Sequence, residues 1–410
     1  MATVSAYLDN AATSWPKPRA VADAMCAFLR DAAGNPGRGG HALARAAVEP
    51  VEDVRERLAG LIGSPCPNRV VMTHGCTDSV NLAIHGVLRG ALRKCPPKKP
   101  KVVTSVAEHN AVTRTLGCYH ESGEIEMEIV PCDGTGFVDP EAFLAACTPC
   151  TALACLTHAS NAAGTVQAVG EVGRRLRERS PCALFLVDAA QTVGHLAVDV
   201  IADEIDLLAI AGHKGLLGPT GTGALFVGCR AFPTPGESDP EAARMFCQRR
   251  GGTGAVAPGL NMPNVLPDAL EAGTVNAVGF AGLLAAIDAR ESGWHENEAA
   301  LTKRLLGSLG ATDGVTLRGP GVDAERTPVV LFSVDGACPR EIGRELDERF
   351  GVCVRGGTHC APLLHQAIGT GEAGAVRVSP GWASTEAEVD LFIRGIETIV
   401  AERRVAGASR

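Results

Sequence analysis

Hydrophobic and polar positions alternate along the first half of the chain between short apolar runs and longer amphipathic stretches. The apolar runs have strand length, and they predict strands at Arg69–Thr73, Val102–Val106, Ala152–Leu156, Ala183–Val187, Asp206–Ala211 and Ala224–Val227. The amphipathic stretches between and before them predict helices at Arg19–Asp31, Ala42–Leu61, Val80–Leu92 and Val169–Arg179. Repetition of strand, crossover helix and strand is typical of a mostly parallel sheet covered on both faces, so we predict an α/β fold.

The pattern changes in the last third of the chain, where a smaller α+β unit is indicated. Its predicted elements are the helices Val275–Arg290 and Glu296–Gly310, the strand Val329–Val334 and the helix Arg340–Phe350. A chain of 410 residues has room for one large and one small domain. We expect an N-terminal segment, 1–18, that packs with the small domain, a large domain, 19–270, and a small C-terminal domain, 271–410.

Composition and charge exclude several classes of function. Hydrophobic residues make up 46% and charged residues 20% of the chain, which is ordinary for a globular protein. The net charge of -8 argues against a nucleic-acid partner, which would need a concentrated basic face. The sequence has neither a charged-then-apolar leader nor an apolar run long enough to span a membrane, so we expect a cytoplasmic protein without a membrane partner.

The 15 cysteines are scattered through apolar segments of a long chain, unlike those of short disulfide scaffolds. Most of them are therefore predicted to be small buried hydrophobic residues. Cys147 and Cys150 have CxxC spacing, but no second pair follows at the distance of a zinc finger. We predict no metal site.

One predicted strand end carries a lysine with two possible roles. The apolar run Asp206–Ala211 stops at Gly212, and His213 and Lys214 precede a glycine-rich turn. Ligands of open α/β sheets bind in the crevice outside the carboxyl ends of the strands, so Lys214 is a candidate for covalent chemistry. The alternative is a solvated lysine at a strand end, followed by a hairpin-like turn.

Other strand ends carry polar residues with the same ambiguity. Thr77, after Gly75, is either part of an anion site at a helix start or an ordinary N-cap. His109 either stacks on a planar ligand or is a satisfied polar residue at a helix start. Asp188 directly follows a predicted buried strand.

Taken together, these residues fit one cofactor. Asp188 and Lys214 both follow strands and can open on the same crevice. Pyridoxal 5'-phosphate needs a lysine for its aldehyde, a carboxylate at its ring nitrogen and an anion site for its phosphate. His109 would stack on the ring, Thr77 and His213 would bind the phosphate, and Gln191 would lie near the ring hydroxyl.

At this point the chain resembles the class V aminotransferase-like enzymes and, within them, the cysteine desulfurases. The resemblance covers nearly the whole length, through YLDNAAT at Tyr7, THGCTDSVNLAI at Thr73, AEHNAV at Ala107, SNAAGT at Ser160, VDAAQTVG at Val187, AGHKGLLGPTGTGALFV at Ala211, EAGTVN at Glu271 and VRGGTHCAPL at Val354. It implies a fold type I pyridoxal-phosphate transferase that works as a homodimer.

The resemblance also implies roles for individual residues. Lys214 matches the Schiff-base lysine, Asp188 the partner of the ring nitrogen, and His109 the stacking residue. The other cofactor contacts that it implies are Asn161, Gln191, Cys76, Thr77, His213 and, from the neighbouring subunit, Thr274. Many relatives have a hydroxyl residue at the position of Ala211 and Thr or Ala at that of Cys76, so one phosphate contact is expected to be lost or replaced.

The segment Val352–Pro362 is predicted to be a loop that carries the reacting thiol. Cys360 lies beside His359 and near Arg355, which favours its deprotonation, although a single cysteine among many is usually structural. The resemblance makes Cys360 the persulfide-forming cysteine and Arg377 the arginine that binds the substrate carboxylate. Arg355, Asn161 and Arg38 are further predicted substrate contacts.

The expected reaction converts L-cysteine to L-alanine and leaves the sulfur on Cys360, with Lys214 moving the α-proton. Only a short segment separates Cys360 from Arg377, which resembles the compact-loop group of desulfurases and implies a sulfur-acceptor protein or reductant. Alternatives are a selenocysteine lyase acting on L-selenocysteine, a transamination or C–S lyase reaction, and a non-enzymatic sulfur or metal carrier.

Overall fold

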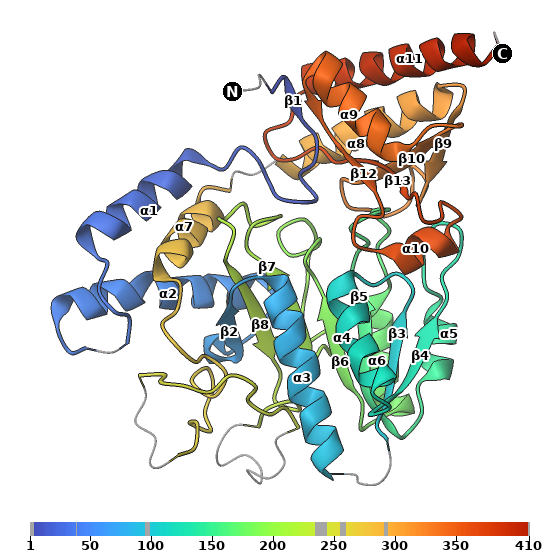
Figure 1. Cartoon of the computed structure of the whole chain (residues 1–410). Coiled ribbons are helices and arrows are strands. Elements are labelled where there is room, and N and C mark those ends of the chain that lie inside the picture. Colours follow the sequence, from blue (N-terminus) through green and yellow to red (C-terminus); the bar gives the residue numbers. More distant parts are fainter. Residues whose placement is uncertain are drawn as a thin grey trace.

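A seven-stranded sheet forms the centre of the larger part of the molecule (Figure 1). The computed structural model describes residues 4–37, 39–94, 99–233, 244–254, 260–290 and 294–408. The sheet runs in the order β2-β8-β7-β6-β5-β3-β4. Its strands are β2 (Val70–Thr73), β3 (Lys101–Ser105), β4 (Glu126–Val130), β5 (Thr151–Thr157), β6 (Leu184–Asp188), β7 (Leu207–Ala211) and β8 (Gly223–Val227). The pairs from β7 to β4 are parallel and those made by β8 are antiparallel, which confirms the mostly parallel α/β fold.

Helices cover both faces of this sheet because its strands are apolar on both faces. Every residue of β6 is buried, and Leu186 belongs to one apolar cluster while Val187 belongs to the other. The first face is covered by α3 (Cys76–Lys94) and α4 (Asn110–Glu121). The second is covered by α2 (Ala42–Leu61), α5 (Pro140–Ala146), α6 (Val169–Arg179) and α7 (Ala277–Asp288), with α1 (Arg19–Asp31) packed on α7.

A second, antiparallel sheet with its own core lies above the first in Figure 1. Its order is β12-β13-β10-β9, formed by β12 (Arg355–Gly357), β13 (Ala375–Val378), β10 (Val330–Val334) and β9 (Val315–Arg318). The helices of this part are α8 (Trp294–Ala311), α9 (Pro339–Phe350), α10 (Pro362–Ala367) and α11 (Glu386–Ala408). A short 3-10 helix, η1 (Pro67–Arg69), precedes β2.

The N-terminal segment joins the second core. Strand β1 (Ala6–Tyr7) pairs in parallel with β11 (Val352–Cys353), and Leu8 is completely buried in the cluster that contains Phe332. The chain then crosses back to the large sheet before α1 (Figure 1). It therefore contacts both parts of the molecule between Ala6 and α1.

The structure corrects two predicted boundaries. The helix after β2 begins at Cys76 instead of Val80, because Asp78 in its first turn accepts a hydrogen bond from the backbone N–H of His74 (2.9 Å). The segment Val352–Pro362 is not entirely a loop, since it contains β11 and β12. The reason is that Val352 is fully buried and β12 completes the small sheet beside β13.

The pattern also missed β4, β9 and α5. Residues of β4 are largely exposed at the sheet edge, and α5 has only 7 residues. Neither β4 nor α5 therefore gives a strong periodic signal. No helix among the described residues is both long and apolar enough to cross a membrane.

Gly374 gives a test of how the small sheet positions the site. Its φ is +75°, and a Cβ added there would lie 2.0 Å from the carbonyl oxygen of Gly357 in β12. We expect Gly374→Ala to lower the free energy of unfolding by more than about 2 kcal/mol, because backbone strain adds to a clash with backbone. Urea unfolding followed by circular dichroism would measure this loss.

Gly371→Ala is the matched control. Gly371 also has a positive φ, +61°, but nothing lies within 4 Å of an added Cβ. This variant should lose only about 1 kcal/mol, the cost of the left-handed backbone alone. Equal losses in the two variants would contradict the close approach of Gly374 to β12.

Candidate active site

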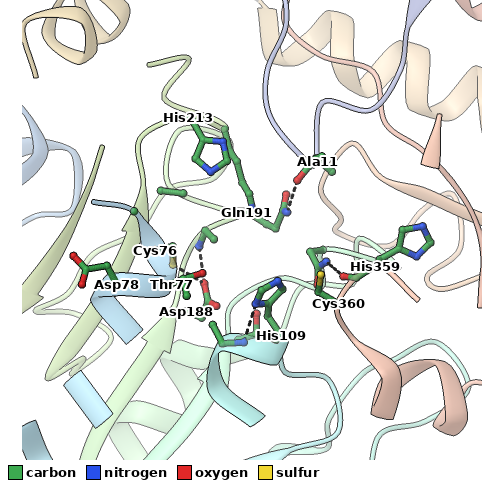
Figure 2. Close-up of a pocket in the computed structure, with 18 of the residues that line it drawn as sticks. Ala11, Cys76, Thr77, Asp78, His109, Asp188, Gln191, His213, His359 and Cys360 are labelled. Atoms are coloured by element: carbon green, nitrogen blue, oxygen red, sulfur yellow. Dashed lines mark hydrogen bonds between the residues drawn. The ribbon is translucent and has the colours of Figure 1, made fainter. Parts of the chain in front are cut away.

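A cavity of about 570 Å³ opens at the carboxyl ends of β5, β6 and β7, where the small sheet meets the large one (Figure 2). The strand ends bring their following residues to one edge of the sheet, which is the usual ligand position in α/β folds. The predicted site residues that line the cavity are Cys76, Thr77, His109, Asn161, Asp188, Gln191, His213, Lys214, Arg355, Cys360 and Arg377.

Asp188 and Lys214 lie in this cavity because they follow neighbouring parallel strands. Asp188 ends β6 and is only 6% exposed, and Lys214 follows the end of β7. Burial lowers the pKa of Lys214, an effect that the negative charge of Asp188 partly opposes. The lysine is therefore a partly buried amine in the same cavity as an acid, which excludes the alternative of a simple solvated strand end.

The two carboxylate oxygens of Asp188 have different surroundings. Oδ1 accepts hydrogen bonds from the backbone N–H of Ala190 (3.0 Å) and from the Cys76 thiol (3.2 Å). Burial raises the pKa of Cys76 well above its ordinary value, so the thiol keeps its proton and remains a donor. Within the described ranges Oδ2 accepts no hydrogen bond. It is thus available to a cationic group of a ligand.

Cys76 has a contact that the sequence did not predict. In the sequence, Cys76 differed from the Thr or Ala of many relatives at a predicted phosphate contact. In the structure its thiol instead donates to Asp188 (Figure 2). The earlier start of α3 explains this placement, because it makes Cys76 the first helical residue. Cys76 thus orients the acid.

His109 caps a helix and lines the cavity at the same time. Its Nδ1 accepts the backbone N–H of Ala111 (3.0 Å) at the start of α4, so the neutral ring carries its proton on Nε2. Burial lowers its pKa, which favours that neutral form. The two alternatives for His109 are compatible, because capping uses one nitrogen and leaves the ring face open to the cavity.

Thr77 and His213, the predicted phosphate contacts, both line the cavity. Thr77 is the second residue of α3, so it lies inside the helix and is not the N-cap. The unpaired N–H groups of a helix start attract anions. The Nδ1 of His213 lies 3.1 Å from the Thr13 hydroxyl, and burial lowers its pKa to about 4, so the ring is neutral.

Two amide side chains connect segments around the cavity. The Nε2 of Gln191 donates to the carbonyl of Ala11 (3.0 Å), and the Nδ2 of Asn161 donates to the carbonyl of His359 (2.5 Å). Their N–H donors therefore hold the N-terminal segment and the Cys360 loop over the cavity.

The backbone around Cys360 is left-handed at two consecutive residues, His359 (φ +50°) and Cys360 (φ +58°). Such pairs are unfavourable for residues with side chains and need support. His359 supplies it, because its Nε2 lies 3.0 Å from the carbonyl of Arg355 and its Nδ1 lies 3.1 Å from Nε2 of His365. The Cys360 carbonyl also accepts the N–H of Asn110 (2.7 Å).

The charge beside Cys360 comes from Arg355 and not from His359. Burial lowers the pKa of His359 to about 2 and that of His365 to about 4, so both rings are neutral. The Nη2 of Arg355 lies 3.7 Å from Sγ of Cys360. His359 therefore brings no positive charge to the thiol, and the charged side chain beside Sγ is that of Arg355.

Arg377 is the most enclosed charge at the site, with 1% of its surface exposed. Its Nη1 donates to the carbonyl of Asn161 (2.8 Å), and its Nη2 forms an ion pair with the carboxylate of Asp9. Arg377 and Arg355 are register partners on β13 and β12. Sequence reasoning missed Asp9, although it is part of the YLDNAAT stretch, because a pattern of residues does not reveal which charges pair.

One predicted site residue lies elsewhere. Thr274 lines a second cavity of about 440 Å³ with Arg55 and Glu271, so within one chain it is apart from Lys214. Its contact with a neighbouring subunit stays a prediction. Arg38 lies outside the described residues.

The family description "Aminotransferase class-V" matches residues 6–392. The chain belongs to the class V aminotransferase family. A probable cysteine desulfurase of Methanothermobacter thermautotrophicus is 33% identical over 402 residues, 96% of this chain and 94% of that protein. A cysteine desulfurase of Salmonella agona is 32% identical over 401 residues, 96% of this chain and 93% of that protein.

Solved structures agree with this class V assignment. The apo cysteine desulfurase of Thermococcus onnurineus NA1 has a TM-score of 0.83 at 29% identity, with 97% of this chain and 95% of that one covered. The cysteine desulfurase CsdA of Escherichia coli has a TM-score of 0.80 at 26% identity, with 96% and 94% covered. The predicted resemblance to class V cysteine desulfurases and the predicted fold type are confirmed.

Glu108, next to His109 in this class V chain, gives a pH-dependent test of the buried site. It is 1% exposed, and Oε1 accepts from the Ser105 hydroxyl (2.8 Å) and from the Thr157 N–H (2.8 Å). Burial raises its pKa from 4.5 to about 8. The carboxyl is thus protonated in the folded chain at neutral pH.

A carboxyl group whose pKa is higher in the folded state contributes its full stability below the unfolded-state pKa. This contribution is lost as the pH rises from there through the folded-state pKa. We therefore expect Glu108 to lower the stability progressively between pH 4.5 and 8. Glu108→Gln keeps the Oε1 acceptor and should flatten this decline, gaining roughly 2 kcal/mol or more at pH 8. Chemical unfolding at several pH values measures it, and parallel curves for the two proteins would contradict the raised pKa.

Proposed function

We propose that this chain is a pyridoxal-phosphate-dependent cysteine desulfurase that converts L-cysteine to L-alanine and receives the sulfur on Cys360. The observation that carries the proposal is the presence of Lys214, Asp188 and Cys360 in one cavity. An amine and an acid at neighbouring strand ends suit the cofactor, and a thiol on the opposite side suits sulfur transfer. The names of the relatives support this choice among class V reactions.

The cavity residues fit pyridoxal phosphate by their donor types. The unpaired Oδ2 of Asp188 would accept from the protonated ring nitrogen, and Lys214 would hold the aldehyde carbon. His109 would pack on the ring, while Thr77 at the start of α3 and neutral His213 would bind the phosphate. When bound, this group supplies an electron sink for the charge left at the substrate α-carbon.

Lys214 is suited to act as a base once the substrate amine has displaced it. Burial lowers its pKa, so a larger share of the amine is uncharged at neutral pH than for an exposed lysine. It can then take the α-proton of the substrate and return a proton later. Arg377, Arg355 and Asn161 would hold the substrate carboxylate, and Arg38 is a further candidate.

Cys360 performs the sulfur step. Its thiolate, with Nη2 of Arg355 at 3.7 Å from Sγ, attacks the substrate sulfur, so that an S–S bond forms and the C–S bond breaks. The electron pair of the broken bond remains on the β-carbon, which is protonated to become the methyl group of L-alanine. The balance is L-cysteine plus the Cys360 thiol to L-alanine plus the Cys360 persulfide.

The proposal includes three further features. A homodimer would let Thr274, which lines a separate cavity, reach the phosphate of the neighbouring subunit. A sulfur-acceptor protein or a reductant would clear the persulfide. A cytoplasmic location suits a chain with 15 cysteines, whose thiols stay reduced there.

Mass spectrometry of the loaded protein after L-cysteine tests the sulfur step. We expect one added sulfur on Cys360 together with one L-alanine, and neither in Lys214→Ala. Cys360→Ser should form no protein persulfide. Cys353→Ser is the matched control, because this cysteine lies on β11 in the same part of the chain and should leave the transfer unchanged. Added sulfur on another cysteine of Cys360→Ser would contradict the assignment.

Comparison of two amino acids separates the desulfurase from the lyase alternative. With L-cysteine, Cys360→Ala should lose at least about a hundredfold in alanine formation, because Cys76, the other cysteine among the described cavity residues, keeps its proton and donates to Asp188. Alanine formation from L-selenocysteine should be affected less if selenium leaves without that thiol. Full activity of Cys360→Ala with L-cysteine would favour a C–S lyase.

A further inference from the structure

The ion pair between Arg377 and Asp9 sets the charge at the proposed carboxylate site. Arg377 is almost fully enclosed, with Nη1 bonded to the carbonyl of Asn161 and Nη2 to Asp9. Its Nε is buried and has no hydrogen-bond partner in the described part of the chain. The guanidinium is thus held at two nitrogens, and its Nε–H remains for another acceptor.

Backbone pairing fixes the position of Asp9. Strand β1 pairs with β11 just before it, and Asp9 itself bridges Ser379, two residues after Arg377 on the chain. The Tyr7 hydroxyl donates to the carbonyl of Thr13 (3.0 Å), and this hydrogen bond closes the segment that contains Asp9. Backbone pairing on both sides therefore holds the Asp9 carboxylate against Arg377.

The carboxylate of Asp9 balances the charge of Arg377 in the pocket. A buried guanidinium without a partner is costly, and the Asp9 carboxylate offsets that cost. Arg355, the register partner of Arg377, has Sγ of Cys360 as its recorded side-chain contact. Among these side chains Arg377 is countered by Asp9, while Arg355 lies beside Sγ of Cys360.

We propose that Asp9 is a positioning residue for the substrate: it holds Arg377 in the orientation that receives the α-carboxylate. This inference rests on the proposed function. It assigns Asp9 no contact with the reacting atoms, and it makes the N-terminal segment part of substrate recognition. The same segment is anchored to the large sheet, since Gln191 donates to the carbonyl of Ala11.

Asp9→Asn removes the charge and keeps the size of the side chain. We expect the KM for L-cysteine to rise about tenfold, the effect of one weakened charge-assisted contact, with kcat within about twofold. The inhibition constant of L-alanine, which carries the same carboxylate, should rise in parallel. Asp9→Glu, which retains the charge, should recover part of both. An unchanged or lower KM and inhibition constant in Asp9→Asn would overturn the proposal.

Tyr7→Phe is the matched control for a merely structural effect. It removes a hydrogen bond of the same segment but leaves the Asp9 carboxylate, so the KM should stay within about twofold of the wild type. A rise equal to that of Asp9→Asn would show that the segment, and not the charge, matters, and would overturn the proposal.

Thermal unfolding of the cofactor-free chain gives a readout independent of the reaction. Asp9→Asn should lower Tm, because it leaves the buried Arg377 without its counter-charge. The double variant Asp9→Asn with Arg377→Met should recover part of that loss, and an additive further loss would contradict the pairing. Absence of sulfur transfer in the wild type would overturn only the proposed function, because the Tm comparison does not depend on sulfur transfer.

Discussion

The site depends on the parallel pairing of β6 with β7. Asp188 is the register partner of Ala209, and the chain needs only a few residues beyond β7 to bring Lys214 to the same edge of the sheet. Because parallel strands end at a common edge, the acid and the amine meet without any special loop. Asp188 is buried in a sheet that helices cover on both faces, and partial removal from water lowers the pKa of Lys214. The chemistry is thus a consequence of the sheet.

The second half of the site is supplied by a different kind of structure. Cys360, Arg355 and Arg377 come from the small antiparallel sheet, where side chains opposite each other on β12 and β13 lie close together. Neutral histidines His359 and His365 support the left-handed backbone at Cys360 instead of contributing charge. The large sheet therefore provides the cofactor side of the cavity, and the small sheet provides the side that would meet substrate and sulfur.

Strand periodicity and strand-end residues were enough to predict the parallel sheet, Asp188 and Lys214, because these depend on local apolar runs. The exposed edge strand β4 and the short strands around Cys360 gave no such signal. The pairing of Asp9 with Arg377, 368 positions apart, and of Cys76 with Asp188 could not be read from the sequence either. Such contacts depend on how distant segments approach, which residue patterns do not encode. Burial can also reverse an argument from charge. It keeps His359 neutral, so this histidine brings no positive charge to Cys360.

The hydrogen bond from the Asn110 N–H to the Cys360 carbonyl joins the two halves of the molecule at one point. Asn110 begins α4 directly after His109, so the loop that carries the thiol is bonded to the start of the helix that His109 caps. A hinge movement that carried the small sheet outward would have to break this link and disturb the first turn of α4. The position of the Cys360 loop relative to His109 is therefore set by the backbone, and opening of the cavity is coupled to the start of a helix.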